Sequence, residues 1–341
     1  MNVLIVHDEV GADASPDAAD AVAQAEVVAA ALAALGHDSV NISVGLDLDL
    51  ARRAILDANA DVAFNLVESL GGHGRLIHVI PSLLDTMGVR YTGAPADAIY
   101  QTSNKLAAKR LMRLAGVPTP MWIETDHPGG LMNDAENAEG TSSSHGQQWI
   151  IKSTWEHASI GLDEHSIVTA TDESDLREEI EHRRQRLGGD AFAEKFIEGR
   201  EFNLSVLAGD DAPEVLPPAE IEFRGFADNQ ARIVGYRAKW EAGSFEYENT
   251  PRRFTFPAAD SVLLETMRAI AVRCWRLFAL RGHARVDFRV DHVGRVWVLE
   301  VNANPCLSPD AGFAAALAEA GIEFSQAIDR ILRDVPGAAH A

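Results

Sequence analysis

The strongest constraint on the fold of this chain lies in its last sixth, where two stretches of alternating charged and apolar residues flank a turn. Residues 285–290 read Arg-Val-Asp-Phe-Arg-Val and residues 299–305 read Leu-Glu-Val-Asn-Ala-Asn-Pro, with the turn Asp-His-Val-Gly at 291–294. Side chains alternate across a strand, so the apolar residues would face a core and the charged residues would face the other way. The pattern predicts an antiparallel hairpin with one buried face and one polar face.

The polar face of this hairpin carries oxygen ligands. Asp287 lies on the first strand, and Glu300 and Asn302 share one face of the second. Oxygen ligands without Cys or His suit Mg²⁺ held jointly by protein and substrate phosphates, and Arg285 would neutralise charge on a transferred phosphoryl group. A solvated hairpin would show the same alternation. The apolar flank at 296–301 favours the metal–nucleotide site, because a buried Glu300 needs a partner.

Composition limits the classes of protein to consider. A chain of 341 residues that is 47% apolar has room for two or three globular domains, and its formal charge of −21 argues against nucleic acid or an anionic membrane as a partner. Cys274 falls on the apolar face of a helical pattern and Cys306 stands alone, so neither a disulfide framework nor a zinc site is predicted. There is no leader-like start and no apolar run long enough to span a bilayer, which predicts a cytoplasmic location. A homodimer is left open.

The N-terminal third alternates short apolar runs with helical patterns. Strands are expected at 3–6, 39–44 and 62–66, and helices at 18–35 and 50–58. This order predicts a parallel α/β domain. A Gly-x-Gly-x-x-Gly motif is missing after the first strand, so dinucleotide binding has little support there.

The remaining elements are expected at wider intervals. Helices are predicted at 76–87, 103–115, 263–277 and 328–332, and strands near 91 and at 149–152, 191–196 and 202–207. A shift to Gly, Ser, Asn and Asp predicts a mobile insertion at 127–148.

Two of the remaining segments offer positive charge to a phosphate. Lys152 ends an apolar strand and precedes Ser159 and Gly161, in a small-residue loop whose backbone N–H groups would cradle phosphate. Lys239, followed by Trp240, lies between charged strands and would reach a γ-phosphate. Each lysine is also consistent with a solvated strand face.

A third segment would hold the base and the sugar of a nucleotide. Residues 194–197, Glu-Lys-Phe-Ile, present a strand end to an adenine edge, and Glu201 would accept hydrogen bonds from ribose hydroxyls. A plain hairpin turn at Gly199 would give the same pattern.

In order and spacing these segments resemble the ATP-grasp superfamily, and within it the D-alanine–D-alanine ligases, from residue 61 to residue 332. The matching motifs are Gly88-Val89-Arg90-Tyr91-Thr92-Gly93, Asn104-Lys105 with the stretch 110–118, Ile151-Lys152 with Ser159-Ile160-Gly161, the stretch 194–201, and Arg285-Val286-Asp287 with Glu300-Val301-Asn302. The resemblance implies a three-domain α/β (α+β) fold. Its N-terminal parallel α/β domain would cover residues 1–95, and two antiparallel-sheet subdomains, 96–192 and 193–335, would clamp ATP.

The resemblance also implies a role for each candidate residue. ATP would be held by Lys105, Lys152, Ser159, Glu194, Lys195, Phe196, Ile197 and Glu201. Two Mg²⁺ ions, for which Mn²⁺ can substitute, would be held by Asp287, Glu300 and Asn302. Lys239 would contact the γ-phosphate, and Arg285 would stabilise the transition state.

Family members phosphorylate a carboxylate and let an amine attack the acyl phosphate, which gives an amide, ADP and phosphate. Such a reaction needs alignment and positive charge more than covalent help from the protein. We therefore predict an ATP- and Mg²⁺-dependent carboxylate–amine ligase for amino acids or a peptide-like metabolite. The alternatives are a small-molecule kinase and a non-catalytic ATP-binding regulatory protein of the same fold.

Several positions depart from the D-alanine–D-alanine ligases. Ala158 stands in place of the first of two serines, and Trp240 in place of a tyrosine. Glu68 stands in place of a histidine, and Ala311-Gly312 in place of a serine-leucine pair that would receive the second substrate's carboxylate. The Ser-x-Glu signature of the first loop is missing as well. These differences predict that the product is not a D-alanine dipeptide.

A loop and a helix start complete the predicted substrate residues. Glu68, His73 and Arg75 cluster in the loop where the family recognises its first amino acid, and Glu68 suits an ammonium while Arg75 suits a carboxylate. A polar loop leading into a helix would carry the same residues. Asp310 is expected to cap a helix whose first N–H groups, near 311–312, would receive an anion.

Overall fold

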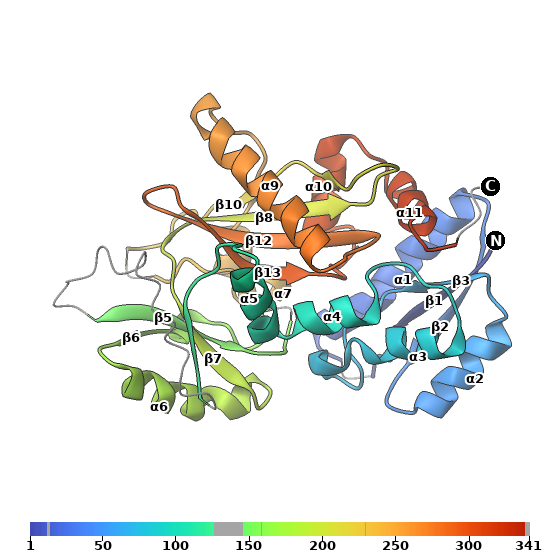
Figure 1. Cartoon of the computed structure of the whole chain (residues 1–341), viewed down its shortest axis with the longest axis horizontal. Helices are drawn as coiled ribbons and strands as arrows, with labels where there is room; N and C mark the ends of the chain where they lie inside the picture. The colour runs from blue at the N-terminus through green and yellow to red at the C-terminus, as the bar shows by residue number, and fades with distance from the viewer. Residues whose placement is uncertain (12–13, 126–145, 158, 229, 338–341) are drawn as a thin grey trace.

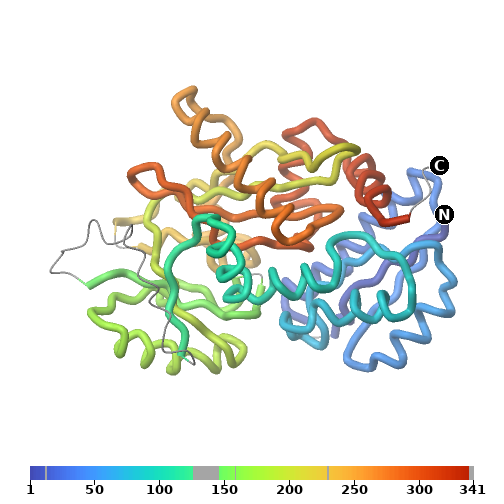
Figure 2. The backbone as a smooth tube through the Cα atoms, in the orientation of Figure 1, coloured from blue at the N-terminus to red at the C-terminus, as the bar shows by residue number. Residues whose placement is uncertain are grey.

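The computed structural model describes residues 1–11, 14–125, 146–157, 159–228 and 230–337 (Figure 1). Most of the insertion predicted at 127–148 lies outside these residues, and its last two residues begin a strand. The N-terminal sheet lies at one end of the molecule and the two other sheets at the opposite end, with helices between them (Figure 2). No helix in the described part of the chain is long and apolar enough to cross a membrane.

The N-terminal domain is the predicted parallel α/β unit. Its elements are β1 (Asn2–Asp8), α1 (Pro16–Ala34), β2 (Asp38–Val44), α2 (Leu48–Ala58), β3 (Val62–Asn65), the short 3-10 helix η1 (Gly74–Leu76) and α3 (Val79–Met87). The sheet has the order β2-β1-β3, with both pairs parallel. Tyr91 extends it by one parallel bridge to Ala63, where a short strand was predicted. All side chains of β3 are buried, as expected for a parallel sheet covered on both faces.

Helix α5 (Lys105–Leu114) confirms the helix predicted at 103–115, and a further helix that was not predicted, α4 (Ala96–Ser103), precedes it. Asn104 separates them because its extended backbone ends α4, while its side chain accepts a hydrogen bond from the N–H of Ala107 at 2.9 Å and so caps α5.

The central sheet has the order β4-β7-β5-β6, and all three of its strand pairs are antiparallel. Its elements are β4 (Trp122–Glu124), β5 (Gln147–Ser153), the 3-10 helix η3 (Glu164–Ser166), β6 (Ile167–Ala170), α6 (Glu173–Arg184), the 3-10 helix η4 (Gln185–Leu187) and β7 (Ala191–Lys195). Leu176 and Ile180 of α6 pack against Ile151 and Ala193, which leaves the other face of the sheet for a neighbour. Strand β7 runs across the boundary proposed at residue 192.

The C-terminal sheet has the order β11-β10-β8-β12-β13, with β9 beside β8. Its elements are β8 (Gly199–Leu207), β9 (Glu214–Val215), β10 (Ala219–Ile221), the short helices α7 (Tyr236–Trp240) and α8 (Phe245–Glu248), β11 (Arg252–Arg253), the 3-10 helix η5 (Ala258–Asp260), α9 (Ser261–Leu277), β12 (His283–Asp291) and β13 (Val296–Asn302). Helix α9 covers one face, where Met267 and Cys274 join a core with Val286 and Phe288. The opposite face carries the polar residues of the sheet.

Three local predictions need correction. Lys239 lies in the short helix α7 rather than between strands. Helix α10 (Gly312–Ala320) begins after Ala311 without any side-chain cap, so Asp310 does not cap it. Gly199 begins β8 instead of forming a hairpin turn; its φ is +144°, and a Cβ there would lie 2.0 Å from the carbonyl oxygen of Val290.

The last two helices return to the first domain. Helix α11 (Phe324–Arg333) packs on α1, and α10 packs on β8. Val28 and Leu32 of α1 share one buried core with Phe313, Ile328 and Ile331. The N-terminal sheet and the C-terminal sheet are therefore joined by a common core.

Candidate active site

Strands β12 and β13 form the predicted hairpin, and its polar residues line a cleft of about 400 Å³. Asp287 lies opposite Glu300, and Arg285 lies opposite Asn302, with a register shift just after Asp287. The Nδ2 of Asn302 donates to Asp287 Oδ2 at 3.2 Å and to Glu300 Oε1 at 3.5 Å. The three predicted metal ligands thus converge at one point of the cleft.

Asp287 is the most connected of these ligands. Arg285 donates to both of its carboxylate oxygens at 2.8 Å, and Asn203 of β8 donates to one of them at 2.7 Å. Burial opposes the charged form of Arg285, yet Asp287 and Glu300 hold the pKa of its guanidinium above its ordinary value.

The donor set fits Mg²⁺ in its chemistry. Two carboxylates and an amide supply the hard oxygen atoms that Mg²⁺ takes, once the amide of Asn302 makes a half-turn that replaces its nitrogen with its oxygen. Within the described residues no three His, Cys, Asp or Glu side chains group as a metal site. The remaining ligands would therefore come from water and substrate phosphates, as is usual for Mg²⁺.

Glu300 is surrounded by cations. Burial alone would raise the pKa of its carboxyl, but Lys105, Lys239 and Arg285 lower that pKa far below its ordinary value. Glu300 is therefore ionised at neutral pH. Its charge offsets part of the positive field that the cleft presents to a polyphosphate.

Lys152 is oriented by a buried carboxylate. Its Nζ lies 2.6 Å from Glu194, which is 1% exposed and is also paired with Lys109. Burial raises the pKa of Glu194, but the two lysines outweigh it and lower the pKa overall. Because both carboxylate oxygens face lysines, Glu194 fixes Lys152 in the cleft. Its predicted contact with adenine stays a prediction.

Lys105 reaches the cleft from the N-terminus of α5. Its Nζ donates to the carbonyl oxygen of Glu156 at 2.6 Å. Lys109, one turn later on the same helix, is the buried partner of Glu194. The four-residue spacing places both lysines on one face of α5. Lys105 lines the cleft, and Lys109 lies behind it and pairs with Glu194.

The predicted adenine and ribose residues all line the cleft. They are Lys195, Phe196, Ile197 and Glu201. The backbone N–H of Phe196 bonds to Gln148, at 3.0 Å, and so fixes the segment that follows β7. Glu201 is paired with Arg289 at 2.7 Å, and Arg289 also donates to the carbonyl oxygen of Gly199 at 3.3 Å.

The segment that carries Lys239 is held on two sides. Ser159 Oγ donates to the carbonyl oxygen of Val234 at 2.9 Å, and the N–H of Tyr236 bonds to Leu162 at 3.1 Å. The hydroxyl of Tyr236 donates to Asp17 of α1 at 2.7 Å. These bonds join the loop after β5, helix α7 and the N-terminal domain over the cleft.

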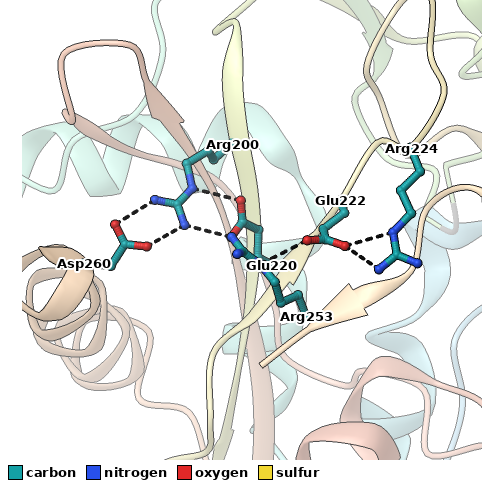
Figure 3. Close-up of polar contacts among 6 residues, drawn as sticks. All are labelled: Arg200, Glu220, Glu222, Arg224, Arg253 and Asp260. Carbon is teal, nitrogen blue, oxygen red and sulfur yellow. Dashed lines mark hydrogen bonds and ion pairs between the residues drawn. The ribbon is translucent and has the colours of Figure 1, made fainter. Parts of the chain in front are cut away.

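A network of ion pairs stands where this segment leaves and rejoins the sheet (Figure 3). Glu220 of β10 binds Arg200 at 2.7 Å and also pairs with Arg253 of β11. Arg200 reaches Asp260 at 2.8 Å, and Arg253 reaches Glu222 at 3.2 Å. Residues 222–251, which carry Lys239 and Trp240, are thereby anchored at both ends.

Four of the predicted substrate residues line the cleft, namely Glu68, Trp240, Ala311 and Gly312. Glu68 accepts a hydrogen bond from Gln24 at 2.7 Å, and Asp20 lines the cleft beside it. Burial, together with Asp8 and Asp20, raises the pKa of Glu68 to about 7. This wall is therefore acidic and partly protonated near neutral pH.

The other two predicted substrate residues lie outside the lining of the cleft. His73 is exposed. Arg75 stacks over the ring of Trp155 at 5.3 Å and lies 4.0 Å from Asp190. The structure thus separates these two side chains from Glu68.

Several residues of the cleft were not predicted as site residues. They are Asp20, His157, Asn203, Arg252 and Arg289, and behind the lining lies Lys109. Strand alternation from Asp287 was a usable signal for Arg289, and helical spacing from Lys105 was one for Lys109. Asp20 and Arg252 come from elements far apart in the chain, and no local pattern links them.

Proteins of similar sequence include D-alanine–D-alanine ligases. A family model described as "D-ala D-ala ligase C-terminus" matches residues 111–333. An uncharacterized protein, y4sG, of Sinorhizobium fredii is 31% identical over 90% of this chain and 86% of its own length. A D-alanine–D-alanine ligase of Synechococcus sp. (strain JA-3-3Ab) is 29% identical over 89% of this chain and 85% of its own.

Solved structures with the same fold include D-alanine–D-alanine ligases. The enzyme from Bacillus anthracis complexed with ATP superposes with a TM-score of 0.71 over 98% of this chain and 97% of its own, at 20% identity. At that identity the likeness establishes the fold, which is the three-domain α/β arrangement expected from the sequence.

Proposed function

We propose that this chain, which belongs to the D-ala D-ala ligase C-terminus family and is an ATP-dependent, ADP-forming C–N ligase, joins an amino acid or a peptide-like acid to an amine other than D-alanine. ATP and Mg²⁺ are its cofactors. The observation that carries the proposal is the lining of the cleft beside the metal hairpin. Glu68 and Trp240 lie there with Ala311 and Gly312, at positions where the resemblance implies a histidine, a tyrosine and a serine-leucine pair.

The proposed reaction has two steps. A carboxylate oxygen of the first substrate bonds to the γ-phosphorus of ATP, and the bond to ADP breaks. The amine nitrogen then bonds to the acyl carbon, phosphate leaves with the electron pair of the broken C–O bond, and the amine loses a proton.

The chain supplies charge and alignment to these steps. Lys105, Lys152 and Lys239 line the cleft as cations, and Arg285 stands beside the hairpin carboxylates. Cationic groups lower the free energy of the transition state most where negative charge spreads over a transferred phosphoryl group in a site that excludes water. Mg²⁺, which we propose as two ions held by Asp287, Glu300 and Asn302, would neutralise phosphate charge.

Two physical arguments favour a substrate other than D-alanine. With Glu68 and Ala311 in place of the histidine and serine that the resemblance implies for D-alanine, the specific hydrogen bonds of that substrate are lost, at a cost of about 1–3 kcal/mol each. The indole of Trp240 offers a wide apolar face that a larger side chain or a cationic group can cover.

The test is a panel of acids and amines assayed with Mg-ATP for ADP release, with mass spectrometry of the products. We expect an amide with ADP for a bulkier amino acid, and no turnover for D-alanine alone. A stable phosphorylated acid would instead indicate a kinase. D-alanine dipeptide formed at a rate comparable to the best other product would refute the proposed specificity.

We also propose that the enzyme works in the cytoplasm. Both cysteines are free thiols, which suits a reducing compartment. A homodimer stays a prediction.

A further inference from the structure

Arg252 is a cleft residue that the assignments above leave unused. It lies on β11 opposite Ile221, is exposed to solvent, and lines the same cleft as Arg285. Its one hydrogen bond to the described residues runs from Nη1 to the carbonyl oxygen of Asp310 at 3.2 Å. A guanidinium carries five N–H donors, so most of those of Arg252 stay available.

The neighbouring arginines each form an ion pair with a carboxylate, whereas Arg252 forms none with the described residues. Arg253 points to the other side of β11 and pairs with Glu220. Arg285 is held by Asp287 at 2.8 Å. Among the described residues no carboxylate forms an ion pair with Arg252, so this cleft cation has spare capacity for an anion.

The surroundings of Arg252 favour an anion as its partner. Partial loss of water at the cleft and the nearby positive charge of Arg285 hold the pKa of Arg252 below its ordinary value, and a bound negative charge would offset both effects. Gly312 lies against the guanidinium, since a Cβ at that position would be 3.5 Å from Nε. A larger side chain at 312 would cover the face of the guanidinium that glycine leaves open.

Another part of the cleft lining has the complementary charge. Asp20 and Glu68 line it, and they attract an ammonium. The cleft therefore offers an acidic wall and an unpaired arginine to the same substrates. The carboxylate of the first substrate becomes a neutral acyl group once it is phosphorylated. The carboxylate of an amino acid that serves as the amine stays ionised throughout, and a fixed guanidinium suits that group better.

We propose that Arg252 binds the free carboxylate of the amine substrate and so selects amino acids or peptides, rather than simple amines, as the group that attacks the acyl phosphate. The proposal rests on the proposed function, because it requires an amine to complete the reaction. Arg252 would act as a specificity-determining residue of the second step only.

The test separates the two steps with hydroxylamine, a small amine without a carboxylate that converts an acyl phosphate to a hydroxamic acid and phosphate. Wild type, Arg252→Met and Arg252→Lys are compared, with Arg224→Met as the control because Arg224 is an exposed arginine whose ion pair, within the described residues, is with Glu222. Each acid of the panel is assayed with hydroxylamine, then with amino acids and with the corresponding amino acid amides.

We expect Arg252→Met to keep wild-type hydroxamate formation and wild-type KM for ATP. Its KM for a carboxylate-bearing amine should rise by about tenfold to a hundredfold, the range for a lost charge-assisted contact. The preference for an amino acid over its amide should vanish with it. Arg252→Lys should restore part of the preference, and Arg224→Met should match wild type.

Arg252→Met with an unchanged preference for amino acids over amides would overturn the inference. So would equal loss of hydroxamate formation in Arg252→Met and Arg252→Lys, which would indicate a structural role. Wild type that forms neither ADP nor hydroxamate would refute the proposed function instead. Equilibrium dialysis of radiolabelled panel amino acids with a non-hydrolysable ATP analogue would then test the inference directly. Equal amino acid binding by wild type and Arg252→Met, or no binding by either, would overturn it.

Discussion

Replacing Glu68 with Gln should stabilise the protein at pH 8 and leave its stability at pH 4 nearly unchanged. Glu68 is largely buried beside Asp8 and Asp20, with part of its surface on the cleft, and its hydrogen bond comes from Gln24 at 2.7 Å. Burial raises the pKa of its carboxyl from 4.5 to about 7. The folded protein therefore binds a proton at Glu68 more tightly than the unfolded chain does.

Because the pKa of Glu68 is higher in the folded protein than in the unfolded chain, stability falls as pH rises. Below pH 4.5 the carboxyl is protonated in both states, and the raised pKa then favours the folded state fully. Between pH 4.5 and about 7 the unfolded chain ionises first, so stability falls as pH rises. The shift corresponds to about 3 kcal/mol lost by pH 8. Asp8, whose pKa burial raises to about 6, adds to the same trend.

The assay is thermal unfolding of wild type and Glu68→Gln at pH 4, 6 and 8. The glutamine keeps the shape and still accepts from Gln24, so the variant should gain an increment in apparent Tm that grows with pH and reaches on the order of 5 °C at pH 8. Glu178→Gln, at an exposed position of α6, is the matched control and should show no such trend. A variant less stable than wild type at pH 8, or a Tm difference that does not change with pH, would refute the reasoning.

Two further predictions concern the metal hairpin and the segment over the cleft. Glu300→Gln should keep the fold but lower Mg-ATP turnover by about a hundredfold or more, because a metal-binding charge is lost; ADP release measured against Mg²⁺ concentration checks this, and an unchanged Mg²⁺ dependence would end the metal assignment. Tyr236→Phe removes the bond to Asp17, worth about 1 kcal/mol, and should raise amide hydrogen exchange at 233–240 in the presence of a non-hydrolysable ATP analogue, while exchange in α9 stays as in wild type. Equal protection of 233–240 in both proteins would show that the bond does not hold this segment.

The sequence was most informative where one local pattern decides the structure. The hairpin, and the shared polar face of Glu300 and Asn302, follow from alternation on two strands joined by a short turn. The pairing of Asp287 with Glu300 also depends on a bulge between Asp287 and Phe288, which alternation alone does not predict. The parallel N-terminal domain follows equally from its order of strands and helices.

Prediction failed where contacts distant in the chain decide the structure. The segment around Lys239 carries no apolar period, and its helix is held by a bond from Tyr236 to Asp17 on another domain. The acidic wall combines Asp20 of α1 with Glu68, and Arg252 reaches the same cleft from a two-residue strand. No local periodicity encodes such pairings, because they depend on how separate elements pack.

The core that α1 shares with α10 and α11 delays the folding of the first domain during translation. A domain usually folds as it leaves the ribosome, N-terminal part first. Here Val28 and Leu32 of α1 are covered by Phe313, Ile328 and Ile331, which are translated almost three hundred residues later. The first domain must therefore wait with an apolar face uncovered until nearly the whole chain has emerged, a period in which chaperones would protect it.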